Sequence, residues 1–327
     1  MTMASARVSV IIATYNRAAL LDECLAHLRV QGFTHGDEVI VVDNGSTDGT
    51  ADVVVRHQAT WTTPLRLLHE SRPGKSHAIA GGVAAASGDI LVFTDDDVNV
   101  GDGWLDVLRH ALADGPVALA GGPVVARWES AVPQWIRRAR DRHPRLGAPI
   151  ALLDYGARSL DLGSRTLLGA NLAVRRDVFT KVGGFPTHLG KLRGTLLSGE
   201  DHELCRRVQE AGFRAVYVPA AIVHHWVPAN RARVSYFLKW FFWSGITHAI
   251  MDGYGAPSRR EIAGLPLYLV RRAAAAAAGV LAGIVIGNWT MALTRAIDMA
   301  FVAGYAAQRW GVVSAVRLSS AAAGEPA

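Results

Sequence analysis

The sequence predicts an α/β fold in which a mostly parallel sheet carries helices on both faces, and two observations support this class. Residues 8–14 (VSVIIAT), 38–43 (EVIVVD) and 89–94 (DILVFT) are continuous apolar runs, typical of parallel strands that are buried on both sides. Residues 18–30 and 77–86, between these runs, repeat apolar residues at helical spacing. The order strand-helix-strand-helix-strand favours a doubly wound sheet.

Composition indicates a folded protein, and its positive charge alone does not choose between possible partners. Of 327 residues, 50% are hydrophobic, which excludes general disorder. The net charge of +6 suits nucleic acid, anionic lipid or phosphorylated ligands. We find no zinc-ligand spacing, RNA-binding aromatic motif or basic helical repeat, so we set nucleic acid aside.

The cysteines and the first residues favour the cytoplasm. Cys24 and Cys205 both lie in helical patterns, and nothing in the sequence suggests that they pair. The first apolar run covers only about eight residues, which is too short for the core of a signal peptide. We therefore interpret it as the first strand and expect a reducing compartment.

Polar residues follow each of the three predicted strands. Thr14 and Asn16 follow the first, Asp43 ends the second, and the triplet 95–97 (DDD) follows the third. In doubly wound sheets, ligands bind beyond the carboxyl ends of the strands, so these residues are expected to share one crevice.

The three aspartates are chemically unusual. Adjacent carboxylates repel one another unless a cation neutralises them, and Mg²⁺ or Mn²⁺ is typically held by one or two carboxylates together with substrate phosphates. Asp95 and Asp97 point to one side of an extended segment and Asp96 to the other. A solvated acidic turn or a helix cap is the alternative.

A second acidic motif stands at 199–201 (GED), before a predicted helix. Glu200 or Asp201 could act as a general base, or both could simply stabilise the helix N-terminus, where negative charge is favourable. The residues alone leave both interpretations open.

Together, five motifs resemble family 2 glycosyltransferases of the GT-A fold. The resemblance covers roughly residues 7–226 and rests on VSVIIATYNR (8–17), VIVVDNGSTDGT (39–50), FTDDDV (93–98), LLGANLAVRRDVFTKVGGF (167–185) and SGEDHELCRRVQEAGFRAVYVPAAIVHH (198–225). It implies a GT-A, Rossmann-like sheet, a nucleotide-sugar donor with UDP as the expected nucleotide, a divalent metal (Mg²⁺ or Mn²⁺), and transfer of a hexosyl group with inversion.

The resemblance also implies roles for the nucleotide-binding residues. Asp43 matches the carboxylate that bonds the nucleobase, with uracil expected, while Thr14 and Asn16 lie near the nucleoside. Arg72 and Lys75 resemble the basic segment that approaches the diphosphate.

The resemblance assigns the remaining roles to the two acidic motifs. Asp97 is the expected metal ligand, Asp95 lies nearer the ribose or sugar and contributes to the metal, and Asp96 could substitute for either on the nucleotide side. Asp201 matches the catalytic base, with Glu200 near the donor sugar.

Two further positions each have two possible interpretations. Asn171 could bond a sugar hydroxyl or only a turn carbonyl. Of His224 and His225, only one can reach the metal or diphosphate, since side chains alternate along a strand, and we assign His224.

Two other classes of function were weighed. A nucleotidyltransferase should carry a Gly-rich, basic loop after its first strand, whereas ATYNRAALL passes directly into a helix. A non-catalytic nucleotide-binding or membrane-scaffold protein would keep the sheet without the base, and the joint presence of Asp43, the triplet and Asp201 argues against it.

The chain is expected to divide into a catalytic domain (1–230) and a helical region (231–327). Residues 236–250 are rich in aromatics, and 273–294 is an uncharged run between arginines. An in-plane membrane anchor or a helical hairpin would each explain them. The anchor would place the enzyme at the inner face of the cell membrane and suggests a lipid-linked or cell-envelope glycan acceptor.

Overall fold

The computed structural model describes residues 6–113, 115–137, 143–192, 194–253 and 260–313, which form two compact units. The first unit comprises Met1–Arg127, Ala151–Gly190 and Gly199–Trp226, and the second comprises Trp128–Ile150, Lys191–Ser198 and Val227–Ala327. The catalytic region that we expected at 1–230 therefore gives two internal segments to the second unit.

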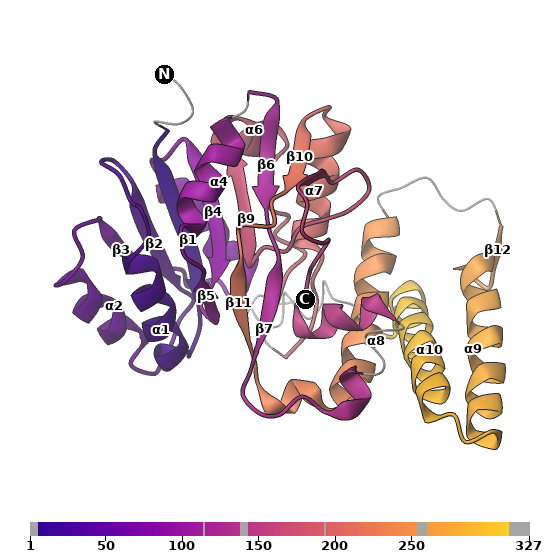
Figure 1. The fold of residues 1–327 in the computed structure, drawn as a ribbon. Helices are drawn as coiled ribbons and strands as arrows, with labels where there is room; N and C mark the ends of the chain where they lie inside the picture. The colour runs from indigo at the N-terminus through magenta and orange to yellow at the C-terminus, as the bar shows by residue number, and fades with distance from the viewer. Residues whose placement is uncertain (1–5, 114, 138–142, 193, 254–259, 314–327) are drawn as a thin grey trace. The chain divides into compact units, whose positions relative to one another are not determined.

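A large sheet forms the centre of the first unit (Figure 1). The order of its eight strands is β3 (Leu65–His69), β2 (Glu38–Asp43), β1 (Val8–Thr14), β4 (Ile90–Asp95), β9 (Asn171–Arg175), β6 (Val117–Gly121), β10 (Arg214–Tyr217) and β8 (Leu160–Asp161). The four strands from β3 to β4 are parallel, whereas β9 runs antiparallel to both β4 and β6. The structure confirms the α/β class and the GT-A-like arrangement.

A smaller sheet extends from the carboxyl end of β4. Its strands are β5 (Val98–Val100), β11 (Val223–Val227) and β7 (Val124–Trp128), with β11 in the middle. Because β5 begins directly after the three aspartates, this sheet brings a distant segment of the chain beside them.

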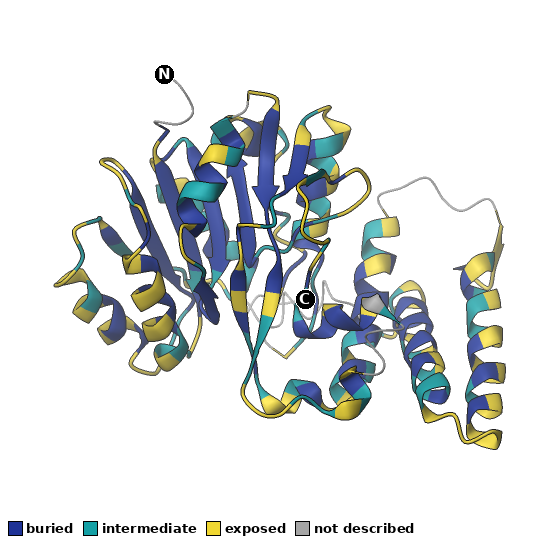
Figure 2. Ribbon diagram, in the orientation of Figure 1, coloured by how far each residue is buried: buried dark blue, intermediate teal, exposed yellow. Residues whose placement is uncertain are grey.

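Helices cover both faces of the large sheet, as the apolar runs predicted. The helices of the first unit are α1 (Ala18–Arg29), α2 (Thr50–Gln58), α3 (Lys75–Ala85), α4 (Trp104–Ala113), α6 (Arg176–Lys181) and α7 (Glu200–Glu210). Val39 and Val41 of β2 share a core with Val54 of α2, while Ile40 packs with Ala78 of α3. Figure 2 shows the strands as almost continuously buried.

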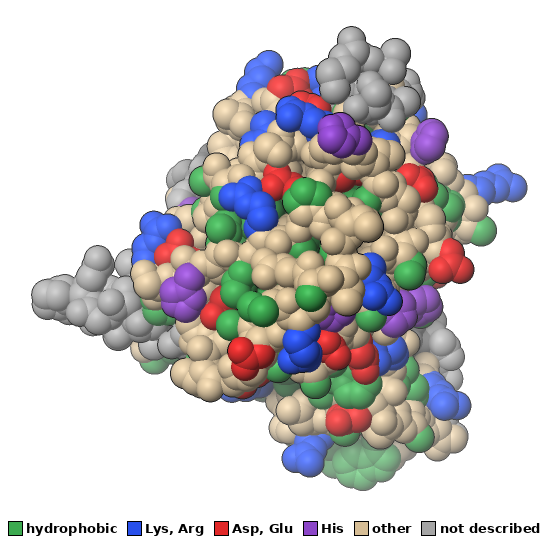
Figure 3. All heavy atoms as spheres, turned by 90° about the vertical axis from the view of Figure 1, so that its left-hand side faces the viewer, with side chains coloured by type: hydrophobic (Ala, Val, Ile, Leu, Met, Phe, Trp, Pro, Cys, Tyr) green, Lys and Arg blue, Asp and Glu red, His purple; other side chains and the backbone are tan. Residues whose placement is uncertain are grey.

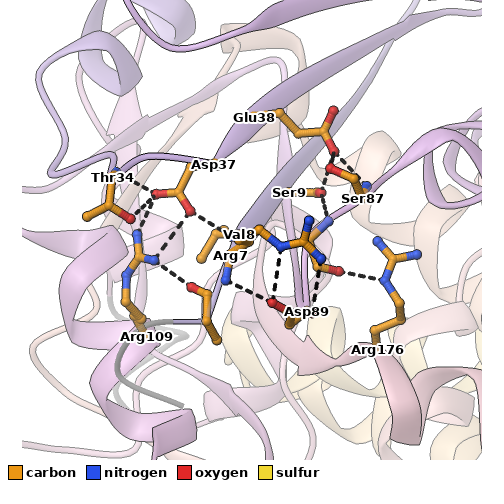
Figure 4. Close-up of polar contacts among 12 residues, drawn as sticks. Arg7, Val8, Ser9, Thr34, Asp37, Glu38, Ser87, Asp89, Arg109 and Arg176 are labelled. Atoms are coloured by element: carbon orange, nitrogen blue, oxygen red, sulfur yellow. Dashed lines mark hydrogen bonds and ion pairs between the residues drawn. The ribbon is translucent and has the colours of Figure 1, made fainter. Parts of the chain in front are cut away.

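Buried polar contacts fix the amino ends of the strands, opposite the expected site (Figure 4). Asp37 forms a fully buried ion pair of 2.6 Å with Arg109 of α4. Glu38 accepts hydrogen bonds from the hydroxyls of Ser9 (2.9 Å) and Ser87 (2.6 Å). Burial alone raises the pKa of Asp37, but hydrogen bonds from Arg109 and backbone N–H groups outweigh it and lower the pKa.

The second unit is mainly helical. Its described elements are the 3₁₀ helices η2 (Pro144–Ile150) and η3 (Ala229–Ala232), the short strands β12 (Glu261–Ile262) and β13 (Leu265–Pro266), and the helices α8 (Val234–Asp252), α9 (Leu267–Val285) and α10 (Trp289–Arg309). Glycines allow α8 and α10 to approach closely, because a Cβ at Gly304 would overlap the carbonyl of Phe242.

The uncharged run 273–294 is divided between two helices. α9 ends at Val285, and after a turn through Gly287 (φ +67°) the side chain of Asn288 caps α10 by accepting a 3.0 Å bond from the Met291 N–H. α9 and α10 therefore form a helical hairpin within the second unit. Among the described residues, α9 is the one helix long and apolar enough to cross a membrane, a test that core helices of soluble proteins also pass.

Candidate active site

The registers of the parallel strands place the expected polar residues at one edge of the sheet. Thr14 lies opposite Asp43, and its neighbour Ala13 lies opposite Asp95. Each strand ends at the same level because the hydrogen-bond ladder aligns the buried apolar runs. The carboxyl edge therefore collects residues that are far apart in sequence.

The loops after β1 and β2 are tied together by side chains. Asn16 adopts a left-handed conformation (φ +51°), and its Oδ1 accepts a 2.7 Å bond from the Thr47 N–H. Asp43 is buried, and its Oδ1 accepts a 2.9 Å bond from the Ser46 N–H. This is the turn expected of a strand-end aspartate, and it holds the carboxylate in place.

Asn44, which we did not single out from the sequence, organises the loop before α3. Its Nδ2 donates to the carbonyls of Glu70 (2.9 Å) and Arg72 (2.7 Å), and its Oδ1 accepts from the Gly74 N–H (2.8 Å). The guanidinium of Arg72 lies at the surface in an ion pair with Glu70. The loop thus delivers Lys75 into the site and leaves Arg72 at its margin.

Three residues at the end of β4 and in β11 form the metal-binding candidate. One ligand atom from each of Asp95, Asp97 and His225 lies within 4.8 Å of the others. His225 is buried, with Nε2 at 3.4 Å from Asp97 Oδ1. We expected His224, but its side chain is exposed, because the pairing of β11 with β5 turns successive residues to opposite sides. The histidine of this group is therefore His225.

Arg17 is the main residue that sequence reasoning missed. Its Nη1 lies 2.8 Å from Asp96 Oδ1 and 2.7 Å from Asp97 Oδ2, so it bridges the two carboxylates. Burial raises the pKa of Asp96, and the Arg17 charge opposes this shift. The signal was present in the sequence, since Arg17 ends the loop that follows the first strand, opposite three aspartates.

Lys75 connects the acidic triplet with the motif at the start of α7. Its Nζ forms an ion pair with Asp95 Oδ1. Burial lowers the pKa of Lys75, but the carboxylates of Asp95, Glu200 and Asp201 together raise it above its ordinary value. Lys75 is therefore paired with the metal-binding candidate and is also influenced by the charge of Asp201.

Asp201 is held as a carboxylate. Its Oδ2 accepts a 3.1 Å bond from the Gly169 N–H, and its Oδ1 accepts from the backbone N–H (2.8 Å) and Nδ1 (3.1 Å) of His202. Burial raises the pKa of Asp201, but the bonds and charge of His202 and the Gly169 N–H outweigh it and lower the pKa. An ionised carboxylate is the form that can accept a proton.

Of the two residues assigned to the sugar, one lies within the site. Glu200 begins α7, is buried, and its charge helps to raise the pKa of Lys75. Asn171 is fully buried, accepts from Trp104 Nε1 (2.8 Å) and donates to the carbonyls of Pro123 (3.1 Å) and Ala221 (2.7 Å). These bonds engage its amide in holding β9, so the structural alternative replaces the sugar contact that we assigned.

The donor set of Asp95, Asp97 and His225 fits a divalent cation. Carboxylate oxygens suit Mg²⁺ and Mn²⁺, and an imidazole nitrogen is a common ligand of transition metals. Arg17 and Lys75 place two positive charges against the three carboxylates of the triplet, so one negative charge remains for a metal to offset.

The comparison with known families decides the identity. A family model described as glycosyl transferase family 2 matches residues 9–183, more than half of the chain. The chain belongs to this family. The matched segment contains the aspartate triplet and the loops after β1 and β2, and it ends before α7 and β11.

Curated relatives of this family 2 glycosyltransferase are themselves named for sugar transfer or for glycan biosynthesis. A glucosyl-dolichyl phosphate glucuronosyltransferase of Haloferax volcanii is 26% identical over 75% of this chain and 77% of that protein. A succinoglycan biosynthesis protein of Rhizobium meliloti is 29% identical over 74% of each chain. An uncharacterized glycosyltransferase of Mycobacterium tuberculosis is 33% identical over 60% of this chain and 96% of its own length.

Solved structures support the fold. A mannosyltransferase of Pyrobaculum calidifontis, solved with GDP-Man and Mn²⁺, superposes with a TM-score of 0.63 at 24% identity, over 94% of this chain and 88% of that one. A GalNAc transferase solved with UDP, GalNAc and Mn²⁺ gives a TM-score of 0.53 at 13% identity, over 77% and 52% of the two chains. Each likeness shows the arrangement of the chain, and the chemistry has to be argued from the residues.

Proposed function

We propose that the protein transfers a hexosyl group from a nucleoside diphosphate sugar, with UDP as the expected nucleotide, to a hydroxyl of its acceptor, with inversion at the anomeric carbon and with the help of a divalent metal. The observation that carries this proposal is the ion pair of Lys75 with Asp95 of the metal-binding candidate, at a site where the charges of Glu200 and Asp201 also raise the pKa of Lys75. A site for the leaving group and a proton acceptor would then share the influence of one cation, which suits a single displacement.

The roles of the side chains follow from their charge and position. Asp201 accepts the proton of the acceptor hydroxyl as its oxygen bonds to the anomeric carbon, and the bond from that carbon to the diphosphate breaks on the opposite face. Lys75 and Arg17 lie where positive charge would stabilise the departing nucleoside diphosphate. Asp43, fixed by Ser46, is positioned to accept the imino N–H of the base.

Asp95, Asp97 and His225 are the residues that would hold the metal. When bound, a divalent ion supplies positive charge to the diphosphate of the donor. The relatives solved with nucleotides were bound to Mn²⁺, and this supports the choice of ion to test first.

We further propose a lipid-linked or cell-envelope glycan acceptor and a location at the inner face of the cell membrane. The support is chemical likeness: one relative is named for a dolichyl phosphate glycolipid and another for the polysaccharide succinoglycan. One apolar helix in the second unit is in keeping with an enzyme that meets its acceptor at a membrane.

The test is calorimetric titration of the full chain with UDP, GDP and dTDP, each with and without Mn²⁺. We expect one nucleotide to bind, only with metal, and that result names the base and directs the choice of sugars for transfer assays. Failure of all three to bind to folded protein would overturn the proposed donor site.

A further inference from the structure

The turn between α9 and α10 exposes a cluster of large apolar side chains, which we call the hairpin tip: Leu281, Ile284, Val285, Ile286 and Trp289. Val285 is 84% exposed, Trp289 71% and Leu281 67%. Figure 2 shows this turn as exposed, in contrast to the buried side of α10. Single exposed apolar residues are common on proteins, but five within nine positions around one turn indicate an interaction surface.

A basic pocket adjoins the hairpin tip. It is a cavity of about 470 Å³ lined by residues of the turn itself and by three arginines: His143, Arg145, Arg272, Asn288, Thr290, Met291, Thr294, Arg295 and Asp298. Asn288 and Thr290 flank Trp289 in sequence, so the pocket and the tip share one turn of the chain. Three arginines against one aspartate leave an excess of two positive charges among these groups.

The pocket is held in shape by its own carboxylate. Asp298 is buried and lies 2.7 Å from Arg145 and 2.6 Å from Arg272, whereas Arg295 stands 3.7 Å away with 46% of its side chain exposed. Burial raises the pKa of Asp298, but the two closer arginines outweigh it and lower the pKa. Asp298 therefore orients Arg145 and Arg272 and leaves Arg295 available to an anion.

The N-terminus of α10 adds to the positive electrostatic potential of the basic pocket. α10 runs for 21 residues from Trp289, and the N-terminal end of a long helix carries a partial positive charge. The pocket thus combines side-chain guanidinium groups with a helix end, and it opens beside an apolar tip. An amphiphile with a phosphate head and hydrocarbon chains matches both halves of this surface.

We propose that the hairpin tip enters the headgroup region of a membrane and that the basic pocket binds the phosphate of an anionic phospholipid there. Burial of the apolar side chains stabilises the membrane-bound tip, with Trp289 at the interfacial depth that tryptophan prefers. Arg295 then reaches the phosphate. This inference rests on the second unit alone and does not depend on the proposed sugar transfer.

The test is co-sedimentation of the full chain with vesicles of phosphatidylcholine, and with vesicles of phosphatidylcholine and phosphatidylglycerol. We expect binding to both and tighter binding to the anionic vesicles. Val285→Ser and Trp289→Ser should each weaken binding to both kinds of vesicle by roughly tenfold, because each removes apolar area that the lipid buries. Arg295→Gln should weaken binding to anionic vesicles by about fivefold and leave neutral vesicles unaffected.

Matched controls lie on α2 of the first unit. Val55→Ser and Arg56→Gln remove an exposed valine and an exposed arginine, and both variants should bind vesicles like the unchanged protein. The face that carries α1 and α2 shows acidic and basic side chains intermingled, so it offers a neutral reference (Figure 3). All five positions are solvent-exposed, and unchanged thermal midpoints would show that the variants fold.

Three outcomes would overturn the proposal. The first is no binding of the full chain to either vesicle, and the second is equal binding by the tip variants and the α2 controls. The third is full release from anionic vesicles by inorganic phosphate, which would make the pocket a site for a soluble anion. Lipid-free sedimentation is run in parallel, and self-association that Val285→Ser abolishes, with no vesicle binding, would assign the hairpin tip to a second copy of the chain.

Discussion

The variant Asp201→Asn should impair the chemical step of transfer while donor binding and folding are retained. The carboxylate accepts from the Gly169 N–H with one oxygen and from the His202 N–H with the other, whereas an amide offers only one acceptor oxygen. One donor, at most partly buried, is then left facing an NH₂ group, which costs no more than about 1–3 kcal/mol of stability. Loss of the general base should lower the transfer rate by about 100- to 10,000-fold, equivalent to roughly 3–5.5 kcal/mol in the barrier.

The assay follows release of nucleoside diphosphate at saturating donor and Mn²⁺, beside calorimetric binding of the same nucleotide. Binding should be retained, because Asp201 lies on the acceptor side of Lys75 in the proposed mechanism. Glu210→Gln, which neutralises an exposed carboxylate at the other end of α7, is the control and should leave transfer unchanged. Full transfer by Asp201→Asn, in protein that binds nucleotide normally, would refute the assignment of the base.

The same carboxylate sets an expectation for pH. Because the pKa of Asp201 is lowered from 3.8, the base stays ionised as pH falls from neutrality, and its loss belongs below pH 3.8. The rate at saturating donor and metal should therefore show no acid limb from this group above that value. An acid limb above pH 3.8 that Asp201→Glu displaces would contradict the lowered pKa.

Three further substitutions test the surrounding structure. Asp37→Asn should destabilise the first unit by about 3–5 kcal/mol in urea unfolding, since it leaves the buried guanidinium of Arg109 without a counter-charge. Asp97→Asn should abolish Mn²⁺-dependent nucleotide binding in calorimetry, because it removes one of the carboxylates of the metal-binding candidate. Gly304→Ala should lower stability by about 1–3 kcal/mol, since the added methyl group meets the carbonyl of Phe242 in α8.

Each of these predictions has a matched comparison. For Asp37→Asn, the comparison is the double variant Asp37→Asn with Arg109→Met, which removes both charges and should recover part of the lost stability. If the single and double variants were equally unstable, the ion-pair explanation would be wrong. Asp102→Asn, at an exposed aspartate, should bind nucleotide normally, and metal-dependent binding that survives in Asp97→Asn would reject that ligand. Ala303→Ser, exposed on the same helix as Gly304, should be neutral.

The central sheet could be predicted because its strands carry their own signal. The apolar runs that end at Thr14, Asp43 and Asp95 are buried on both faces, so their length and order alone indicate parallel strands and a shared carboxyl edge. A strand that is buried on both faces needs apolar residues along its whole length, so it can be recognised from its own sequence without the segments that pack against it.

The errors in the site concern residues whose role depends on distant partners. Whether His224 or His225 turns inward is set by the register of β11 on β5, a pairing across more than a hundred residues that local pattern does not contain. Asn171 was assigned to the sugar because its partners in α4 and the loops near Pro123 and Ala221 are invisible in its own segment. Arg17 was overlooked although its place in the loop after β1 was visible, because its partners Asp96 and Asp97 lie 79 and 80 residues further along the chain.

The position of His225 has a consequence for how the enzyme is made. β11 is the last strand of the first unit in chain order, and the boundary between the two units falls at Trp226, directly after this histidine. On the ribosome, the loops after β1 and β2 and the aspartate triplet emerge long before the histidine of the metal-binding candidate. The nascent chain therefore acquires all three residues only when the last segment of the first unit is made, so a nascent chain stalled before β11 would carry the aspartates without their histidine.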